Sequence, residues 1–366
     1  MKTLALFGST GSIGTQTLEV LRAFPEDFKL LGITGLKNEK LLAKQASEFS
    51  VPGHKGLTHK DTLIAAADII VNALPGFAGL EVSLAAVRAG KTLLSANKES
   101  LAIAGRYLRA EAAKTGAQIF PLDSEASAIW QLLHEYGAAP ISSITLTCSG
   151  GPFRGKTRAE LEHVTIAEAL AHPTWKMGKK VSIDSATLIN KILEIYEVHN
   201  LFDIPLKDIH VVVHPQSIVH SMIHTKTGAT KMHITQNDMK LFISYALHYP
   251  VQPVCPWPIV RTRKSELSFD QPDAETFRSL KWFELHKGNP NFPVVLNALN
   301  DLAVQRFLCG EISFLGIYEF IEAGLEKWLW EVPAATLDEM ISLTQRITNE
   351  YSHSTSRREI PAGRAK

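Results

Sequence analysis

Four polar side chains of different chemistry gather near the start of a helix that we expect to begin at or near Ser185. Asn190, Lys191 and Glu194 follow it within a few turns, so a hydroxyl, an amide, an ammonium and a carboxylate would lie close together. Such a set can hold a phosphate group beside a metal ion, because the donors suit the phosphate and the carboxylate suits the metal. A solvent-exposed polar helix face explains the same pattern without any ligand, so the rest of the sequence must decide.

The loop before this helix, His172–Gly178, carries two large apolar side chains that no helical or strand periodicity assigns to a core. Pro173 and Gly178 interrupt regular structure on either side of them. Because Trp175 and Met177 are costly to leave in water, we expect the loop to be open or disordered without ligand and to close over a bound substrate. The alternative is that Trp175 is packed permanently in the core.

Two further carboxylates flank a serine in Asp123-Ser124-Glu125, which follows an expected strand over 118–122 and precedes an expected helix over 128–136. Ser124 is a suitable N-cap for that helix. The two carboxylates are also suitable oxygen ligands for a hard divalent cation. Both interpretations remain open from these residues alone.

The N-terminal stretch predicts a dinucleotide site. An apolar strand over 3–7 leads into a glycine turn, Gly8–Gly14, and an expected helix over 15–24. The spacing is G-x-x-G-x-x-G, which differs from the usual G-x-G-x-x-G. After a second strand, where an NAD-binding chain places an acidic residue, this chain has Lys37 and Asn38. A cation and an amide favour the 2′-phosphate of NADPH, although an exposed loop lysine explains Lys37 equally well.

Strands and helices continue to alternate through the first third of the chain, which indicates an α/β fold with a parallel sheet. A strand over 92–95 ends in Asn97-Lys98-Glu99, and ligands of such sheets bind at the carboxyl ends of the strands. The next helix is expected over 106–115. Further along, a strand over 141–147 leads to Ser149-Gly150-Gly151, which suits either a phosphate or an ordinary turn.

The second half of the chain predicts a strand over 209–213 and a hairpin of strands over 219–225 and 229–235. Four histidines in this region are expected to be structural, with a metal role as the minor alternative: His214, His220, His224 and His233. The Pro-rich stretch up to residue 273, with Arg261, Arg263 and Lys264, predicts an extended linker. Residues 274–351 are expected to be helical and 352–366 to form a frayed tail.

Composition limits the class of protein. A chain of 366 residues with 45% hydrophobic residues suggests two or three globular domains. The net charge of +1 gives no general electrostatic attraction to nucleic acid or to an acidic membrane. Three widely spaced cysteines suggest a reducing compartment, and no apolar run approaches membrane-spanning length, so we expect a cytoplasmic protein.

Several motifs in a fixed order resemble a known family along nearly the whole chain, the 1-deoxy-D-xylulose 5-phosphate reductoisomerases. The matching stretches are GSTGSIG (8–14), ANKES (96–100), LDSE (122–125), SGGPFR (149–154), HPTWKMG (172–178), DSATLINKILE (184–194) and HPQSIVHS (214–221). Three features differ from the family pattern. The region between Asn38 and Ala65 is short, so the second nucleotide-binding half is expected to be trimmed. Ala126 follows the DSE motif where a histidine is common, and residues 297–301 read NALND where NAANE is usual.

The resemblance implies an α/β protein with a Rossmann-like NADPH-binding domain, an α+β catalytic domain and a C-terminal helical bundle. We place these at residues 1–122, 123–250 and 274–366, with 251–273 as linker and a homodimer formed through the catalytic domain. The implied activity is rearrangement of 1-deoxy-D-xylulose 5-phosphate, by retroaldol and aldol steps or an α-ketol shift, and its reduction by NADPH to 2-C-methyl-D-erythritol 4-phosphate. This reaction belongs to the non-mevalonate isoprenoid pathway.

The resemblance also implies roles for individual residues. The ligands of Mg²⁺, Mn²⁺ or Co²⁺ would be Asp123, Glu125 and Glu194. Residues that bind the substrate would be Ser124, Ser149, His172, Trp175, Met177, Ser185, Asn190, Lys191 and Glu194. Residues that take part in catalysis would be Lys98, Glu125, His172 and Trp175. The cofactor NADPH would be bound by Thr10, Gly11, Ser12, Ile13, Gly35, Lys37, Asn38, Asn97, Lys98 and Glu99.

Two other functions fit parts of the sequence. One is a simple NADPH-dependent dehydrogenase of the sugar-phosphate or homoserine kind, which would have no need for three metal-binding carboxylates. The other is a non-catalytic NADPH sensor, which would have little need for the lid loop and the phosphate-binding residues. Oxidation of NADPH by the keto sugar phosphate, with and without a chelator, distinguishes all three.

Overall fold

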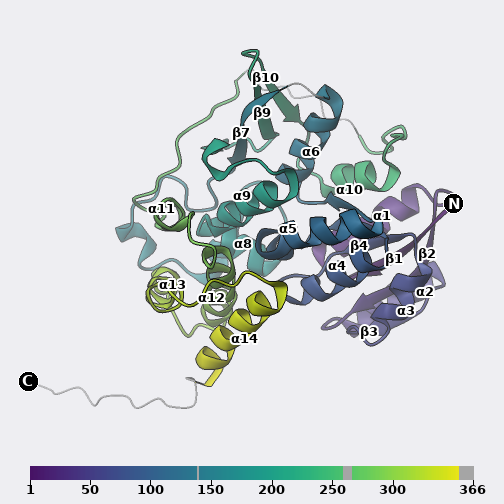
Figure 1. Ribbon diagram of the computed structural model, residues 1–366, viewed down its shortest axis with the longest axis horizontal. Coiled ribbons are helices and arrows are strands. Elements are labelled where there is room, and N and C mark those ends of the chain that lie inside the picture. The colour runs from purple at the N-terminus through teal and green to yellow at the C-terminus, as the bar shows by residue number, and fades with distance from the viewer. Residues whose placement is uncertain (138–139, 259–265, 354–366) are drawn as a thin grey trace, which may run out of the picture.

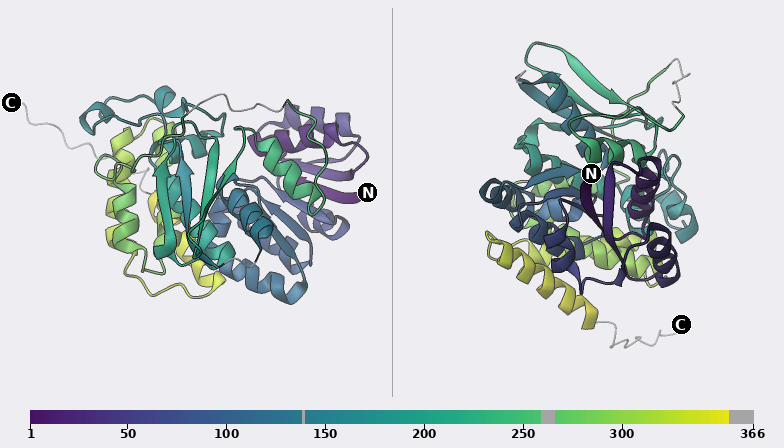
Figure 2. Two further views of the ribbon diagram at one scale, coloured as in Figure 1. Left: turned by 90° about the horizontal axis from the view of Figure 1, so that it is seen from above. Right: turned by 90° about the vertical axis from the view of Figure 1, so that its right-hand side faces the viewer.

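The computed structural model describes residues 1–137, 140–258 and 266–353, and every structural statement below concerns these residues. It confirms the α/β fold. Figure 1 shows the N-terminal sheet on the right and the C-terminal helices at the lower left, and the left view of Figure 2 shows the smaller second sheet between them. The N-terminal sheet has six strands and the second sheet has four.

The N-terminal sheet is parallel and has the strand order β3-β2-β1-β4-β5-β6, the order of a dinucleotide-binding fold. Its central strands are almost continuously apolar because helices cover both faces. The strands are β1 (Lys2–Phe7), β2 (Phe28–Gly35), β3 (Gly53–Lys55), β4 (Ile69–Asn72), β5 (Thr92–Ser95) and β6 (Gln118–Pro121). The helices between them are α1 (Ser12–Ala23), α2 (Glu39–Phe49), α3 (Lys60–Ala66), α4 (Ala78–Arg88) and α5 (Lys98–Thr115).

The glycine turn between β1 and α1 is tight enough to require glycine at two of its three positions. Gly8 has a φ of +87°, and a Cβ there would lie 2.7 Å from the Ala73 carbonyl oxygen. A Cβ on Gly14 would lie 2.2 Å from the Gly8 carbonyl oxygen. The unusual G-x-x-G-x-x-G spacing therefore still brings strand and helix into close contact. The helix begins at Ser12, three residues before the expected Thr15.

The second sheet has the order β10-β9-β7-β8, with β7 and β8 parallel and the other pairs antiparallel. Its strands are β7 (Ile141–Cys148), β8 (Ile209–Val213), β9 (Val219–Thr225) and β10 (Thr230–Ile234), which confirms the predicted strand and hairpin. Helix α6 (Ser124–Tyr136) packs against β9 and β10. The shorter helices of this region are the 3₁₀ turn Ala159–Leu161, α7 (Ile166–Leu170), α8 (Lys179–Ala186) and the 3₁₀ turn Leu206–Asp208.

Helix α9 (Ile189–Phe202) lies in the middle of the molecule and packs against α5 of the nucleotide-binding part. The prediction of one helix from Ser185 was wrong. Helix α8 already begins at Lys179, and Leu188, with a φ of +60°, separates it from α9. The interpretation of this stretch as a solvent-exposed face was also wrong, because Glu194 is 1% exposed. The change of direction at Leu188 turns the first turn of α9 towards the interior.

Two other helices begin earlier than predicted, and a missed cap explains one of them. Helix α5 begins at Lys98 and not near Arg106, because the Asn97 side chain accepts a hydrogen bond from the Ser100 backbone N–H and caps it. Helix α6 begins at Ser124, so Ser124 is its first residue and not its N-cap. Its hydroxyl donates instead to Glu125 at 2.8 Å.

Residues 274–351 are largely helical, as expected. Before them lies helix α10 (Met239–His248), which was not predicted and which packs against α1 near the beginning of the chain. The bundle consists of α11 (Ser279–His286), α12 (Phe292–Leu308), α13 (Phe314–Trp328) and α14 (Leu337–His353). The linker residues Arg261, Arg263 and Lys264 and the tail from residue 354 lie outside the described residues, and 352–353 belong to α14, not to the tail. Among the described helices, none has both the length and the apolar character that crossing a membrane requires.

Candidate active site

A cavity of about 260 Å³ opens between the glycine turn, the N-terminus of α6 and the start of α9. Carboxyl ends of β1, β4, β5 and β6 face it, which is where ligands of open parallel sheets bind. The structure brings most of the predicted site residues to its wall. They are Gly11, Ser12, Ile13, Lys98, Glu99, Asp123, Ser124, Glu125, Ser149, His172, Trp175, Met177, Ser185, Asn190, Lys191 and Glu194.

Three carboxylates meet on one side of this cavity. Asp123 and Glu125 come from the N-terminus of α6, and Glu194 comes from α9. One oxygen of each lies within 4.8 Å of the others. Like charges this close repel each other strongly in a buried site, so the group needs cations to be stable.

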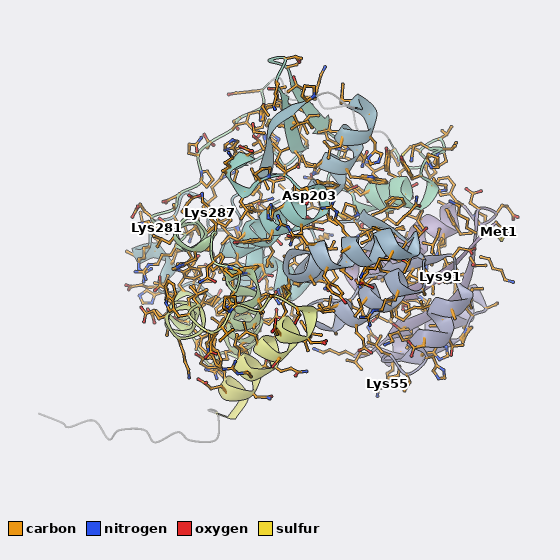
Figure 3. All side chains as sticks on the ribbon, viewed as in Figure 1. Met1, Lys55, Lys91, Asp203, Lys281 and Lys287 are labelled. Atoms are coloured by element: carbon orange, nitrogen blue, oxygen red, sulfur yellow. The ribbon has the colours of Figure 1, made fainter. Side chains whose placement is uncertain are left out.

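Two buried lysines supply part of that positive charge. Figure 3 shows Lys55 and Lys281 at the periphery, as is usual for lysine, whereas Lys98 and Lys191 are 7% and 2% exposed. Lys98 Nζ lies 2.6 Å from Asp123 and 2.8 Å from Glu194. Lys191 Nζ contacts Glu194 and donates to the Thr147 carbonyl, and it lies 3.4 Å from Glu125.

The carboxylates have room for a divalent cation. Asp123 Oδ2 is buried and has no hydrogen-bond partner among the described residues, and the same is true of Asn190 Oδ1. Burial raises the pKa of Asp123 to about 7, although Lys98 opposes this. Burial also acts to raise the pKa of Glu125, but Lys191 and Lys98 hold it below its ordinary value. A hard cation would supply the missing partner, so the donor set fits Mg²⁺ or Mn²⁺.

A second group of polar residues, around His172 and Ser149, also lines the cavity. His172 Nδ1 accepts the backbone N–H groups of Thr174 and Trp175 at 3.3 and 3.0 Å. Burial lowers the pKa of His172 to about 4, so the ring is neutral and carries its proton on Nε2. That N–H points at Ser149 Oγ, 2.9 Å away, which also accepts the Gly151 backbone N–H. These contacts hold the Ser149 hydroxyl in place on the cavity wall, where the sequence predicts a phosphate contact.

The loop His172–Gly178, called the lid below, covers part of the cavity. Trp175 is half-buried and lies edge-on to the His220 ring, with centroids 6.0 Å apart. It is therefore on the cavity wall, and the alternative of a fully packed core residue was wrong. The Ser12 hydroxyl reaches the Lys176 carbonyl at 3.5 Å, which links the glycine turn to the lid. Whether the lid opens without ligand stays a prediction.

The N-terminus of α1 is arranged to accept an anion. Its N-cap Gly11 offers no side chain to the helix, and the first turn contains no acidic residue. Free backbone N–H groups at a helix N-terminus suit a pyrophosphate. Lys37 and Asn38 are exposed beyond the end of β2, and Asn38 also caps α2 by accepting from the Leu41 N–H at 3.0 Å.

The structure leaves five predicted cofactor residues off the cavity wall: Thr10, Gly35, Lys37, Asn38 and Asn97. Asn97 is fully buried, and its amide donates to the Leu74 and Gly76 carbonyls at 3.0 and 2.8 Å. Asn97 therefore holds the loop that contains Leu74 and Gly76 beside the cavity, although Asn97 itself does not line the cavity. Gly35 is buried against Thr10, whose Cγ2 would lie 3.1 Å from a Cβ there.

Several wall residues were not predicted: Ala73, Leu74, Pro75, Ala96, Leu122, Thr147, Cys148, Lys176, Gly178, Val181, Leu188, Ser217, His220 and Met239. Most of these residues are apolar or line the wall with backbone atoms, so their residue types do not indicate a role in the site. His220 and Ser217 lie in the HPQSIVHS stretch, so this motif was the available signal.

The strand histidines are structural, as expected. His224 bonds Thr145 at 2.8 Å and His233 bonds Gln131 at 3.0 Å. Within the part of the chain that the structure describes, the carboxylate triad is the group of potential ligands close enough together for a metal.

Comparison with known proteins gives one consistent result. Models of 1-deoxy-D-xylulose 5-phosphate reductoisomerase match residues 4–54 and 51–105, its C-terminal domain model matches 119–202, and a DXP reductoisomerase C-terminal domain model matches 234–350. The enzyme of that name from Clostridium perfringens is 41% identical over 95% of this chain and 98% of its own length. The one from Caldanaerobacter subterraneus is 39% identical over 96% and 100%.

Solved structures agree. A DOX-P reductoisomerase in complex with NADPH, fosmidomycin and magnesium has a TM-score of 0.86 and 31% identity, covering 97% of this chain and 98% of its own. The Zymomonas mobilis enzyme in complex with NADPH has a TM-score of 0.84 and 31% identity, covering 98% and 100%. The chain described here belongs to the 1-deoxy-D-xylulose 5-phosphate reductoisomerase family.

Proposed function

We propose that this chain rearranges 1-deoxy-D-xylulose 5-phosphate and reduces the product with NADPH to 2-C-methyl-D-erythritol 4-phosphate, using a divalent cation held by Asp123, Glu125 and Glu194. The observation that carries this proposal is the buried triad with an unpaired Asp123 oxygen in the same cavity as the glycine turn. A simple dehydrogenase or an NADPH sensor would not need such a costly group.

The triad is held by two separate parts of the fold, the N-terminus of α6 and helix α9. The N-terminus of α6 fixes Asp123 and Glu125, and the helix dipole there favours negative charge. The Ser124 hydroxyl orients Glu125, and Asn190 contacts Glu194 one turn away. When bound, the cation lowers the pKa of a substrate hydroxyl and polarises the neighbouring carbonyl. Lys98 and Lys191 lie beside these carboxylates, and their charges hold the pKa of Glu125 below its ordinary value.

The phosphate of the substrate would bind beside the triad, at Ser149, Ser185, Asn190 and Lys191. Ser149 already receives two donors, His172 Nε2–H and the Gly151 N–H, so its own hydroxyl proton is free for a phosphate oxygen. A neutral His172 holds Ser149 without adding charge. Because the phosphate lies away from the reacting carbons, its binding energy can be used to close the lid.

The lid excludes water while the reactive aldehyde is present. Trp175 and Met177 supply apolar surface over the cavity, with Trp175 supported by the His220 ring. The glycine turn would hold NADPH, which would supply the hydride. Lys37 and Asn38 would bind its 2′-phosphate.

We also propose that residues 1–122, 123–250 and 274–366 act as cofactor, catalytic and helical domains, and that the second sheet forms a homodimer. Its edge strand β10 exposes Met232 and Ile234, which supports an interface there. The free cysteines Cys148, Cys255 and Cys309 support a reducing compartment such as the cytoplasm. Sedimentation velocity measures the oligomeric state.

The experiment follows NADPH absorbance with 1-deoxy-D-xylulose 5-phosphate, Mg²⁺ and pure protein. We expect oxidation that EDTA abolishes and Mg²⁺ restores, and a clear preference for NADPH over NADH. Turnover that is unchanged in EDTA would favour a simple dehydrogenase, and NADPH binding without any turnover would favour a sensor. Equal kcat/KM for NADPH and NADH would contradict the role of Lys37 and Asn38.

A further inference from the structure

We propose that Lys180 is a positioning residue that couples cofactor binding to the position of the lid. This inference rests on the proposed function, because it takes the Asn97–Glu99 stretch as part of the NADPH site. Lys180 lies in the first turn of α8, two residues after the lid ends at Gly178. Any group that fixes Lys180 therefore fixes one end of the lid.

Lys180 connects three parts of the molecule that are distant in sequence. Its Nζ lies 2.7 Å from Asp184 on α8 itself, 3.2 Å from Glu99 at the start of α5 and 3.2 Å from Asp301 on α12. Glu99 is 4% and Asp184 is 1% exposed, so these ion pairs are formed largely out of water. Buried pairs with several partners fix geometry more strongly than exposed ones.

The contact with Glu99 connects Lys180 to the loop beside the glycine turn, where the cofactor is proposed to bind. The second Glu99 oxygen accepts from the Asn97 amide at 3.0 Å, and the same amide holds the Leu74 and Gly76 carbonyls. This packing is tight, because a Cβ on Gly79 would lie 2.4 Å from the Asn97 side chain. Glu99 is thus part of a rigid connection to the loop that lines the cavity beside the glycine turn.

The contacts with α8 and α12 lead to the helical bundle. The Asn300 amide donates to the second Asp184 oxygen at 2.8 Å, so the carboxylate is held from two sides. Asp301 follows directly and contacts Lys180 from the same helix. Burial raises the pKa of Asp301 to about 6, in keeping with three carboxylates that share one lysine. The bundle thus serves as a fixed support against which Lys180 is held.

The proposed consequence is a coupling between two ligands. NADPH would fix the loop held by Asn97, and Glu99 would then hold Lys180 and the end of the lid. The Ser12 contact with the Lys176 carbonyl provides a second, weaker link from the glycine turn to the lid. Coupling between binding sites is reciprocal, so a closed lid should also tighten the binding of NADPH.

The test is hydrogen–deuterium exchange of the peptide that covers residues 172–181, with and without NADPH and without substrate. In the wild type we expect NADPH to slow exchange there by about fivefold or more, within the usual range of coupling between sites. In Lys180→Met at saturating NADPH this protection should be lost, and the Kd for NADPH should rise by a similar factor, because the coupling is reciprocal. Lys180→Arg should restore part of the protection.

Matched variants separate coupling from folding. Lys179→Met removes the neighbouring exposed lysine of the same helix turn and should keep the full protection. Because Lys180→Met leaves three carboxylates without their cation, its melting temperature is measured first. If it does not fold, Glu99→Gln and Asp301→Asn replace it. Glu99→Gln should abolish protection of the lid, since it cuts the connection to the cofactor side, and Asp301→Asn should keep it.

Three results have different meanings. NADPH protection of the lid that persists in a folded Lys180→Met or in Glu99→Gln overturns the inference. A wild type that binds NADPH and turns over substrate but shows no protection also overturns it, and leaves the proposed function intact. A wild type that does not bind NADPH contradicts the proposed function itself. As a second readout, Lys180→Met should lower kcat/KM for the sugar phosphate about tenfold.

Discussion

Two clusters of buried charge lie side by side along α8 and α9, and they are built from the same residue types for different purposes. In the triad cluster, Lys98 and Lys191 face three carboxylates around a cavity, and Asp123 has an oxygen with no partner among the described residues. In the Lys180 cluster, one lysine lies between Glu99, Asp184 and Asp301.

The difference lies in what the carboxylates contact. Asp184 is held on both oxygens by protein groups, Lys180 and Asn300, so it has no capacity left for a ligand. The oxygens of the triad converge within 4.8 Å of one another and border a space of about 260 Å³. A buried acid that is fully satisfied stabilises a geometry, and one that is not satisfied can bind a cation. Residue type alone does not distinguish the two.

The largest expected effect comes from the triad. Glu194→Gln keeps the shape of the side chain but removes one negative charge from the metal site, so kcat with Mg²⁺ should fall about a thousandfold. The Kd for NADPH should be nearly unchanged, because the glycine turn lies elsewhere. Steady-state kinetics and NADPH fluorescence measure both. Activity close to normal would place the metal elsewhere and remove the contrast between the clusters.

The second-largest expected effect comes from the lid, which runs from His172 to Gly178 and ends beside the Lys180 cluster. Trp175→Ala removes apolar cover from the cavity, so kcat/KM for the substrate should fall about a hundredfold through poorer positioning and closure. NADPH affinity should hardly change. Thermal melting is the control, since Trp175 is only half-buried. A large loss of melting temperature with normal constants in the folded fraction would mean that Trp175 acts in folding.

The smallest effect concerns His220, the ring beneath Trp175 and outside both clusters. Burial lowers its pKa to about 4 from an ordinary 6.5. Below pH 6.5 His220 binds a proton in the unfolded chain but stays neutral in the folded chain until the pH nears 4. This difference makes the free energy of unfolding fall as the pH drops from 7 towards 4. The loss between pH 7 and 5 should be on the order of 2 kcal/mol.

In His220→Asn that part of the pH dependence should disappear. Urea titrations of both proteins at pH 7 and pH 5 measure it, and only the difference between the two proteins is interpreted, because other buried acids titrate in the same range. An identical loss of stability in wild type and variant would show that His220 is not held neutral.

Much of the fold could be predicted because its signals are local. The apolar strands, the glycine turn and the hairpin all follow from short-range patterns, and the order of strands then fixes where ligands bind. The helix starts at Lys98 and Lys179 could not be placed in this way. Asn97 reads as a ligand residue and is a cap, and Leu188 in a left-handed conformation has no signature, since leucine rarely adopts it.

The candidate site residues could be named from the motifs. The sequence does not show which buried acids face the cavity and which pair with Lys180. Glu99 and Glu194 look alike in the sequence, each being an acid near a lysine in the first or second turn of a helix. Only the packing of α12 beside α8 gives Lys180 its third carboxylate, and this contact spans more than a hundred residues. The NALND stretch, which differs from the family pattern, supplies that acid at Asp301.

The most direct test of the account is a titration of the protein with Mn²⁺ in the presence of NADPH, followed by calorimetry or by the electron paramagnetic resonance of the free ion. The wild type should bind one ion per chain in the active-site cavity. Glu194→Gln should weaken binding by at least about tenfold, and Asp301→Asn in the Lys180 cluster should leave it unchanged. Equal affinity in the wild type and Glu194→Gln, or loss of the ion in Asp301→Asn, would contradict the assignment of the triad as the metal site.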